Sequence, residues 1–219
     1  MGRIAIVDYG MGNFHSVARA LRAVAPGQTI HMARQAADIR AADRVVLPGQ
    51  GAMPDCMQTL RASGLLEALL DAARSKPLLG VCVGEQMLFE ASEEGPVAGL
   101  GLLRGRVVRF GGPGFAGPGA GPGGTPPAAL KIPHMGWNAV HQLHPHAMWR
   151  GIAQDTPFYF VHSYFAQPAD PRVIQGCSRY GGPFCCAIAV DNIFAVQFHP
   201  EKSARPGLRL YDNFIRWQP

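Results

Sequence analysis

The chain has 219 residues, of which 47% are hydrophobic and 16% charged, and its formal net charge is +5. This length suits a single domain over residues 1–219 with a substantial buried core, and no apolar run approaches the roughly 20 residues that a membrane-spanning helix needs. The cationic residues are mostly arginines without the basic run of a nucleic-acid-binding surface, so we expect a soluble, cytoplasmic protein that binds neither nucleic acid nor membrane.

Short apolar runs alternate with helical patterns in the first half of the chain. The predicted elements are a strand at Ile4–Val7, a helix at Asn13–Val24, a strand at Arg44–Leu47, a helix at Met57–Ala73, a strand at Leu78–Val81 and a helix starting at Glu85–Ala91. Strands separated by helices form parallel βαβ units, so the pattern predicts an α/β fold with a mostly parallel, doubly wound sheet and flanking helices. Active sites in such sheets lie at the carboxyl ends of the strands.

The second half of the chain consists mainly of short apolar runs joined by turns. Strands are predicted at Val107–Phe110, His134–Val140, Phe158–Phe165, Val173–Tyr180, Cys186–Val190 and Ile193–Phe198. We expect them to add an antiparallel extension to one edge of the sheet. Thirteen of the seventeen residues at 111–127 are Gly or Pro, which predicts a flexible surface loop that is too short to separate two domains.

The cysteines and histidines give no sign of a metal site or a disulfide framework. The cysteines are Cys56, Cys82, Cys177, Cys185 and Cys186. Their odd number and irregular spacing favour a reducing compartment, and no Cys-x-x-Cys pair completes a tetrahedral metal site. The histidines at 141, 144 and 146 surround a proline in a polar stretch, which we interpret as a surface loop. We therefore expect no metal and no cofactor.

Cys82 lies in Gly-Val-Cys-Val-Gly at 80–84, between an apolar run and a helical pattern. Glycines on both sides allow a sharp turn from strand to helix, which is typical of a nucleophile elbow. The positive end of the helix and its unpaired N–H groups would stabilise a thiolate and an oxyanion at this point. A buried core cysteine is the alternative, and this segment alone does not decide between them.

A candidate general base follows the last predicted strand. His199 lies at its end, Pro200 stops further strand pairing, and Glu201 can accept the Nδ1 proton of His199 and orient the ring. Nucleophile, base and orienting carboxylate form a catalytic triad. An exposed His-Pro-Glu turn is the alternative, which the presence of the cysteine elbow disfavours.

Six segments together carry a family resemblance. They are Asp-Tyr-Gly-Met-Gly-Asn at 8–13, Leu-Pro-Gly-Gln-Gly-Ala at 47–52, Gly-Val-Cys-Val-Gly at 80–84, Pro-His-Met-Gly-Trp-Asn at 133–138, Tyr-Phe-Val-His-Ser-Tyr at 159–164 and Gln-Phe-His-Pro-Glu-Lys-Ser at 197–203. In these segments the chain resembles the class I (triad) glutamine amidotransferases, and within them the glutaminase subunits of imidazole glycerol phosphate synthase. The resemblance covers nearly the whole chain and implies a flavodoxin-like fold.

The resemblance also implies a reaction, the hydrolysis of glutamine to glutamate and ammonia. In it Cys82 attacks the side-chain amide, His199 transfers protons and Glu201 orients His199. The family pattern further implies that glutamine is bound by Gln86, Ser163 and Tyr164. For the last two, ordinary hydrogen bonding at a strand end is the alternative.

The family's oxyanion hole combines the N–H of Val83 with the loop Gly49-Gln50-Gly51. A peptide of this loop is thought to turn its N–H inward when the synthase partner is engaged, and glycines make such a turn easy. Replacing Gly49 with Pro or Gly51 with Val is therefore expected to abolish activity and leave the fold intact. Gln50 and Glu85 both depart from the usual family residues, and we expect Glu85 to oppose ionisation of Cys82 slightly.

The implied partner is a cyclase subunit with a (β/α)8 barrel, which uses the ammonia to make imidazole glycerol phosphate and aminoimidazole carboxamide ribotide. The positions that match the family's partner interface are Met11, Asn13, Trp137 and Lys202. A core aromatic and a solvated charge are the alternatives for Trp137 and Lys202. Three other functions stay open: the glutaminase subunit of another class I amidotransferase, a stand-alone cysteine hydrolase, and a non-catalytic regulatory subunit.

Overall fold

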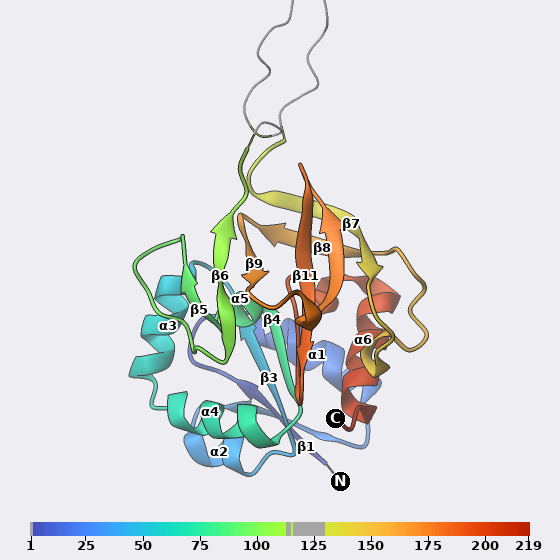
Figure 1. Ribbon diagram of the computed structural model, residues 1–219. Coiled ribbons are helices and arrows are strands. Elements are labelled where there is room, and N and C mark those ends of the chain that lie inside the picture. The colour runs from blue at the N-terminus through green and yellow to red at the C-terminus, as the bar shows by residue number, and fades with distance from the viewer. Residues whose placement is uncertain (1, 113–114, 116–129) are drawn as a thin grey trace, which may run out of the picture.

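The larger of two β-sheets forms the centre of the molecule (Figure 1). The computed structural model describes residues 2–112, 115 and 130–219, so most of the predicted Gly/Pro-rich loop at 111–127 lies outside the described residues. The strand order in this sheet is β2-β1-β3-β4-β12-β11-β10-β7-β8. Its first part is parallel and its second part antiparallel.

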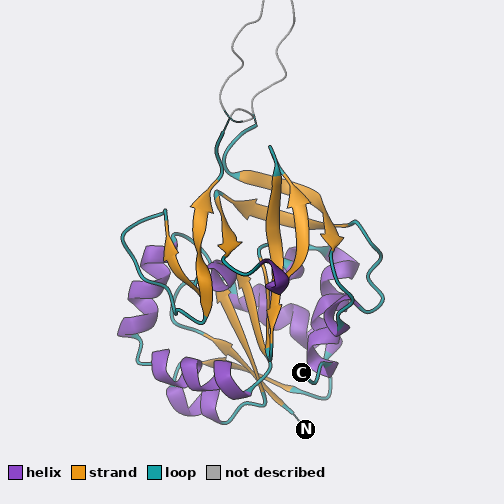
Figure 2. Cartoon of the chain, viewed as in Figure 1, coloured by secondary structure: helices purple, strands orange, loops and turns teal. Residues whose placement is uncertain are grey.

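The parallel part of the large sheet is covered by helices on both faces. Its strands are β1 (Arg3–Val7), β2 (Thr29–Ala33), β3 (Arg44–Gly49), β4 (Leu78–Cys82) and β12 (Ile193–Val196). Every residue of β4 and β12 is buried, as is usual for central strands with two covered faces. One face carries α1 (Phe14–Val24) and α6 (Ala204–Arg216), and the other α2 (Ala36–Arg40), α3 (Met53–Ala62) and α4 (Leu66–Ser75) (Figure 2).

The antiparallel part extends the sheet from β12. Its strands are β11 (Pro183–Val190), β10 (Ile174–Arg179), β7 (His134–Gln142) and β8 (Thr156–His162). The predicted α/β class, with a parallel centre, flanking helices and an antiparallel extension, is thereby confirmed. Short 3-10 turns lie at Ala147–Trp149, Pro171–Val173 and Pro200–Lys202. Within the described part of the chain, no helix is both long and apolar enough to cross a membrane.

A second, smaller sheet was not predicted. It has the order β5-β6-β9, from β5 (Phe89–Ser92), β6 (Leu103–Arg109) and β9 (Tyr164–Pro168). The apolar run predicted as one strand at Phe158–Phe165 is divided at Ser163, because β8 ends in the large sheet and β9 begins in the small one. Ser163 and Tyr164 therefore lie at the corner between the two sheets.

Two helix predictions are wrong in extent. The helix predicted at Met57–Ala73 is two helices, separated where Gly64 adopts a positive φ of 74°. The helix predicted from Glu85 is one short turn, α5 (Val83–Gln86), and after a turn at Met87 and Leu88 the chain enters β5. The sequence reading also missed β2, α2 and α6.

Candidate active site

Cys82 occupies a strained turn at the carboxyl end of β4. It has a φ of 56°, in the left-handed region that non-glycine residues rarely adopt, and it is buried. Gly84 permits this turn, because a Cβ there would collide with the carbonyl oxygen of Leu47 in β3. The sharp strand-to-helix turn expected around Cys82 is present. Because α5 is so short, an anion at this turn would be stabilised by its free backbone N–H groups and not by a long helix dipole.

His199 and Glu201 form a buried pair beside this turn. His199 follows β12 and its backbone N–H donates to Tyr159 O at 2.9 Å. The distance from His199 Nδ1 to Glu201 Oε1 is 2.8 Å, and both side chains are almost fully buried. His199 Nε2 has no hydrogen-bond partner among the described residues, and the ring lines the same cavity as Cys82. The three residues expected to form a triad are thus brought together.

The charges of the pair reinforce each other. Burial alone would favour a neutral His199, but the Cys82 sulfur and the Glu201 carboxylate outweigh it and raise the pKa of His199 to about 10. Burial likewise opposes an ionised Glu201, yet hydrogen bonding and attraction from His199 lower its pKa below the usual range. Each group therefore favours the charged form of the other, a protonated ring beside an ionised carboxylate.

Two further residues lie next to Glu201, of which Asn13 bonds to it, and local sequence reasoning did not identify this placement for either. The side chain of Asn13, which we expected at the partner surface, turns inward and donates from Nδ2 to Glu201 Oε1 at 3.2 Å. Tyr211 of α6 is fully buried, and burial together with the nearby Glu201 raises the pKa of its hydroxyl far above the usual range. Because α6 was missed, no sequence signal pointed to Tyr211.

The cavity beside Cys82 has a volume of about 330 Å³. Its wall includes the predicted residues Gln50, Gly51, Val83, Gln86, Ser163 and Tyr164. Both amide hydrogens of Gln86 are used within the protein, because its Nε2 donates to Tyr164 O at 3.0 Å and to Gln197 Oε1 at 2.8 Å. Only Gln86 Oε1 is left for a ligand.

The glycine loop after β3 is held from below by two buried side chains. Tyr9 Oη donates to Pro48 O at 3.0 Å, and Cys56 Sγ donates to Gln50 O at 3.4 Å. A Cβ on Gly49 would lie 2.8 Å from Gly84 N, so the expectation that the fold tolerates a substitution at Gly49 is wrong. Gly51 has more room but a φ of 97°, which strains any side-chain-bearing residue.

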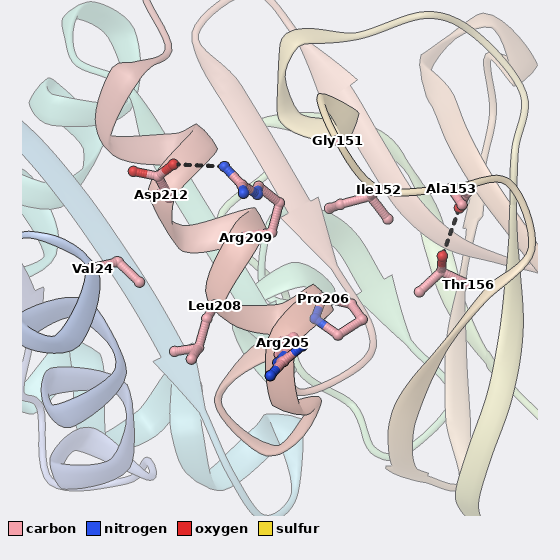
Figure 3. A pocket seen from close by; sticks show the side chains of 10 residues that line it. All are labelled: Val24, Gly151, Ile152, Ala153, Thr156, Arg205, Pro206, Leu208, Arg209 and Asp212. Atoms are coloured by element: carbon pink, nitrogen blue, oxygen red, sulfur yellow. Dashed lines mark hydrogen bonds and ion pairs between the residues drawn. The ribbon is translucent and has the colours of Figure 1, made fainter.

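A larger cavity of about 500 Å³ lies between α1, α6 and the segment before β8 (Figure 3). It contains none of the predicted site residues. The Thr156 hydroxyl in its wall donates to Ala153 O, and Arg209 pairs with Asp212 at 3.3 Å. No thiol or histidine lines this cavity, so its size does not make it the better candidate for acyl-transfer chemistry.

Of the other predicted interface residues, Trp137 and Lys202 are exposed. The Trp137 side chain on β7 is 54% exposed, which excludes the core alternative. Lys202 Nζ lies 5.9 Å from the centroid of the Tyr159 ring, and that ring packs edge-on against Trp137. Met11 is half-buried, with its sulfur 3.5 Å from the Thr59 hydroxyl.

Metal-ligating side chains do not gather in the described residues: no group of three or more His, Cys, Asp or Glu is placed to hold an ion there. His141 pairs with Asp155 at 2.9 Å, and His146 accepts a hydrogen bond from Met148 N. All five cysteines are free thiols.

Glu85 differs from what we expected of it. Its side chain is completely buried in α5, and neither carboxyl oxygen has a partner in the described part of the chain. Burial, and then the proximity of Cys82, raises the pKa of Glu85 well above its usual range. Burial therefore favours the protonated carboxyl, which places no negative charge beside the thiol.

Replacing Glu85 with Met is expected to stabilise the protein by about 1–3 kcal/mol at pH 7, because an unpartnered polar group is removed from the core. The unfolded chain ionises Glu85 above its ordinary pKa of 4.5, whereas the pKa of Glu85 in the folded chain is raised well above that value. Wild-type stability therefore falls as the pH rises above that value, and the advantage of the variant shrinks towards pH 4. Urea unfolding at several pH values measures the difference.

Glu67→Met is the matched control, because Glu67 is exposed on α4. It should leave the free energy of unfolding within about 0.5 kcal/mol of wild type. A Glu85→Met variant that is less stable than wild type at pH 8 would contradict the prediction.

Comparison with known proteins finds relatives that all belong to one family. The family described as "Glutamine amidotransferase class-I" matches residues 5–217. The chain is 56% identical over 216 residues to the imidazole glycerol phosphate synthase subunit HisH of Dechloromonas aromatica, covering 99% of this chain and 97% of the relative. It is 55% identical over 219 residues to the protein of the same name from Aromatoleum aromaticum, with both chains fully covered.

Solved structures with low sequence identity share the fold. A protein described as a putative GMP synthase subunit, from Thermoplasma acidophilum, matches with a TM-score of 0.68 and 20% identity, covering 99% of this chain and 93% of that one. A structure described as a glutamine amidotransferase matches with a TM-score of 0.69 and 16% identity, covering 97% of each chain.

Proposed function

The chain belongs to the class I glutamine amidotransferases, and from this premise we propose that it is the glutaminase subunit of imidazole glycerol phosphate synthase in histidine biosynthesis. The observation that carries the chemistry is the buried His199–Glu201 pair beside a cysteine at positive φ, on the wall of one cavity. The full-length relatives named as HisH support the particular synthase.

In the proposed mechanism the Cys82 thiolate attacks the side-chain amide carbon of glutamine. The N–H of Val83 and the Gln50–Gly51 loop stabilise the oxyanion that forms. Protonated His199 donates its Nε2 proton to the amide nitrogen, ammonia leaves, and a thioester remains.

The second half of the reaction releases glutamate. Neutral His199 removes a proton from water, the water oxygen attacks the thioester carbon, and the Cys82 thiolate leaves. Glu201 stabilises the protonated ring at both stages, and Asn13 holds the carboxylate.

The proposed partner is the cyclase subunit, which takes the ammonia and forms imidazole glycerol phosphate and aminoimidazole carboxamide ribotide. The direct test mixes the purified chain with this cyclase and measures glutamate release with and without the ribonucleotide ligand. We expect release to depend on the cyclase. Equal release from the chain alone would favour a stand-alone hydrolase, and no release with the cyclase would favour another amidotransferase partner or a regulatory role.

Trp137 is the proposed anchor for the cyclase. It is exposed on the same side of β7 as Met135, which is 63% exposed, and its ring packs against Tyr159, over which Lys202 lies. Two large exposed apolar side chains with a cation nearby suit a docking surface. Trp137→Ala is expected to weaken cyclase binding by about 2–4 kcal/mol, measured by titration calorimetry. Leu143→Ala, which removes another exposed apolar side chain beyond the end of β7, is the control. Equal affinities for the two variants would contradict this assignment.

A further inference from the structure

A buried chain of hydrogen bonds ends on the nucleophile. Gln197, the residue after β12, is fully buried, and its Nε2 lies 3.7 Å from Cys82 Sγ as a hydrogen-bond donor. Its Oε1 accepts from Gln86 Nε2 at 2.8 Å. The mechanism above uses neither contact.

The Tyr164 carbonyl oxygen fixes the direction of this chain. A carbonyl oxygen only accepts hydrogen bonds, so the Gln86 atom 3.0 Å from it must be the amide nitrogen. That same nitrogen faces Gln197, which must therefore present its oxygen to Gln86. The other end of the Gln197 amide, the N–H donor, is then directed at the Cys82 sulfur.

The same carbonyl also fixes a pair of buried histidines. His162 Nδ1 lies 2.8 Å from Tyr164 O and must donate, so His162 Nε2 is an acceptor in the neutral ring. His134 Nδ1, 3.1 Å away, donates to it, and His134 Nε2 accepts from Asn138 Nδ2 at 3.3 Å. Every bond from Asn138 to Tyr164 thus has one direction.

Burial keeps both rings neutral, which this arrangement requires. Burial lowers the pKa of His134 to about 4. It lowers the pKa of His162 to about 3, although the hydrogen bond to Tyr164 opposes the shift. Around neutral pH neither ring therefore takes up a proton, and the direction of each hydrogen bond in the series stays the same.

We propose that Gln197 is a further catalytic residue, whose N–H stabilises the Cys82 thiolate, and that His162 and His134 are positioning residues that act through Tyr164 and Gln86. A reversed Gln197 amide would place its oxygen against the sulfur and oppose the anion. The benefit of the Gln197 hydrogen bond to glutamine hydrolysis rests on the function proposed above, whereas its effect on ionisation of the Cys82 thiol does not.

The test follows alkylation of Cys82 by iodoacetamide against pH, with the Cys82 peptide quantified by mass spectrometry. Gln197→Met keeps the side-chain volume and removes the donor. It should raise the midpoint of the rate profile by about 1 pH unit. His162→Phe, in a pocket of aromatic rings, should shift it in the same direction by less, and His162→Asn, which restores a donor near the Nδ1 position, should reverse that shift.

The titratable groups closest to the sulfur are unchanged in every variant. They are His199 after β12, Glu85 in α5, Cys56 in α3 and Tyr9 after β1. Glu94 and Lys202 on the cavity wall are also unchanged, and His162, which lines the same cavity, is replaced only in its own two variants. A shift in the midpoint therefore reports the altered hydrogen bonds. Gln175→Met is the matched control, because Gln175 is another buried glutamine, on β10, and should leave the midpoint unchanged.

The outcomes are distinct. An unchanged midpoint in Gln197→Met, or an equal shift in Gln175→Met, would overturn the proposal. An unchanged midpoint in His162→Phe would overturn the role of the histidines, and this arm decides alone if Gln197→Met does not fold. Because alkylation needs neither glutamine nor cyclase, a missing glutaminase activity would contradict the proposed function without affecting this test.

Discussion

Cys82→Ala is expected to lower glutamine hydrolysis by the complex with the cyclase about 10⁴- to 10⁶-fold, the loss seen when a triad nucleophile is removed. The variant keeps the His199–Glu201 pair and the cavity, so glutamine should still bind. It has no atom that can form the thioester. Glutamate release under saturating glutamine measures the effect.

The same variant also distinguishes loss of glutamine hydrolysis from loss of binding to the cyclase. Ammonia supplied in the buffer should still support the cyclase reaction in the Cys82→Ala complex, because only the source of ammonia is lost. Cys177→Ser on β10 is the control for cysteine replacement and should retain glutaminase activity, since Cys177 does not line the cavity. Hydrolysis above about 1% of wild type in Cys82→Ala would mean that another group is the nucleophile.

The three residues of the proposed triad could be singled out from the sequence because their signals are local. Glycines next to a cysteine after an apolar run indicate a strained turn, and a His-Pro-Glu segment places a carboxylate two residues from the base. The structure adds that Cys82 has a positive φ and that both partners are buried. A strained, buried cysteine beside a buried His–Glu pair is what the local motifs need in order to act as the proposed site.

The supporting groups could not be predicted, because their contacts join distant parts of the chain. Asn13 and Glu201 are 188 residues apart, and Gln86 and Gln197 are 111 apart. No spacing in the sequence encodes such a pairing. The raised pKa of Glu85 has the same origin, since a carboxyl on an expected helix gives no sign that it will be completely buried without a hydrogen-bond partner among the described residues.

Some of the fold errors were avoidable. Buried positions 207, 210, 211 and 214 of α6 follow helical spacing, and Pro206 in the first turn is compatible with a helix start. The helix expected from Glu85 includes Met87, Leu88 and Phe89, three successive apolar residues that are all buried, whereas an amphipathic helix buries only one face. By contrast, β2 is an edge strand with one buried residue, Ala33, and carries little pattern.

Gly84→Ala is expected to destabilise the protein by at least about 3 kcal/mol, because its Cβ would overlap the Leu47 carbonyl oxygen of β3. That oxygen belongs to a central strand and cannot move without disturbing β4, to which β3 is paired up to Gly49 and Cys82. For a chain of this size the loss corresponds to a fall in Tm of roughly 6–12 °C. Thermal unfolding measures it.

Gly182→Ala is the matched control, since a Cβ there has no neighbour within 4 Å among the described residues, and its Tm should stay within about 1–2 °C of wild type. A Gly84→Ala variant that melts like Gly182→Ala would show that β3 and the turn at Cys82 can separate easily. If they cannot, the same close contact determines both the stability of the sheet and the strained conformation of Cys82. The close approach of Gly84 to β3 then holds Cys82 at positive φ, and any side chain at position 84 reduces activity and stability together.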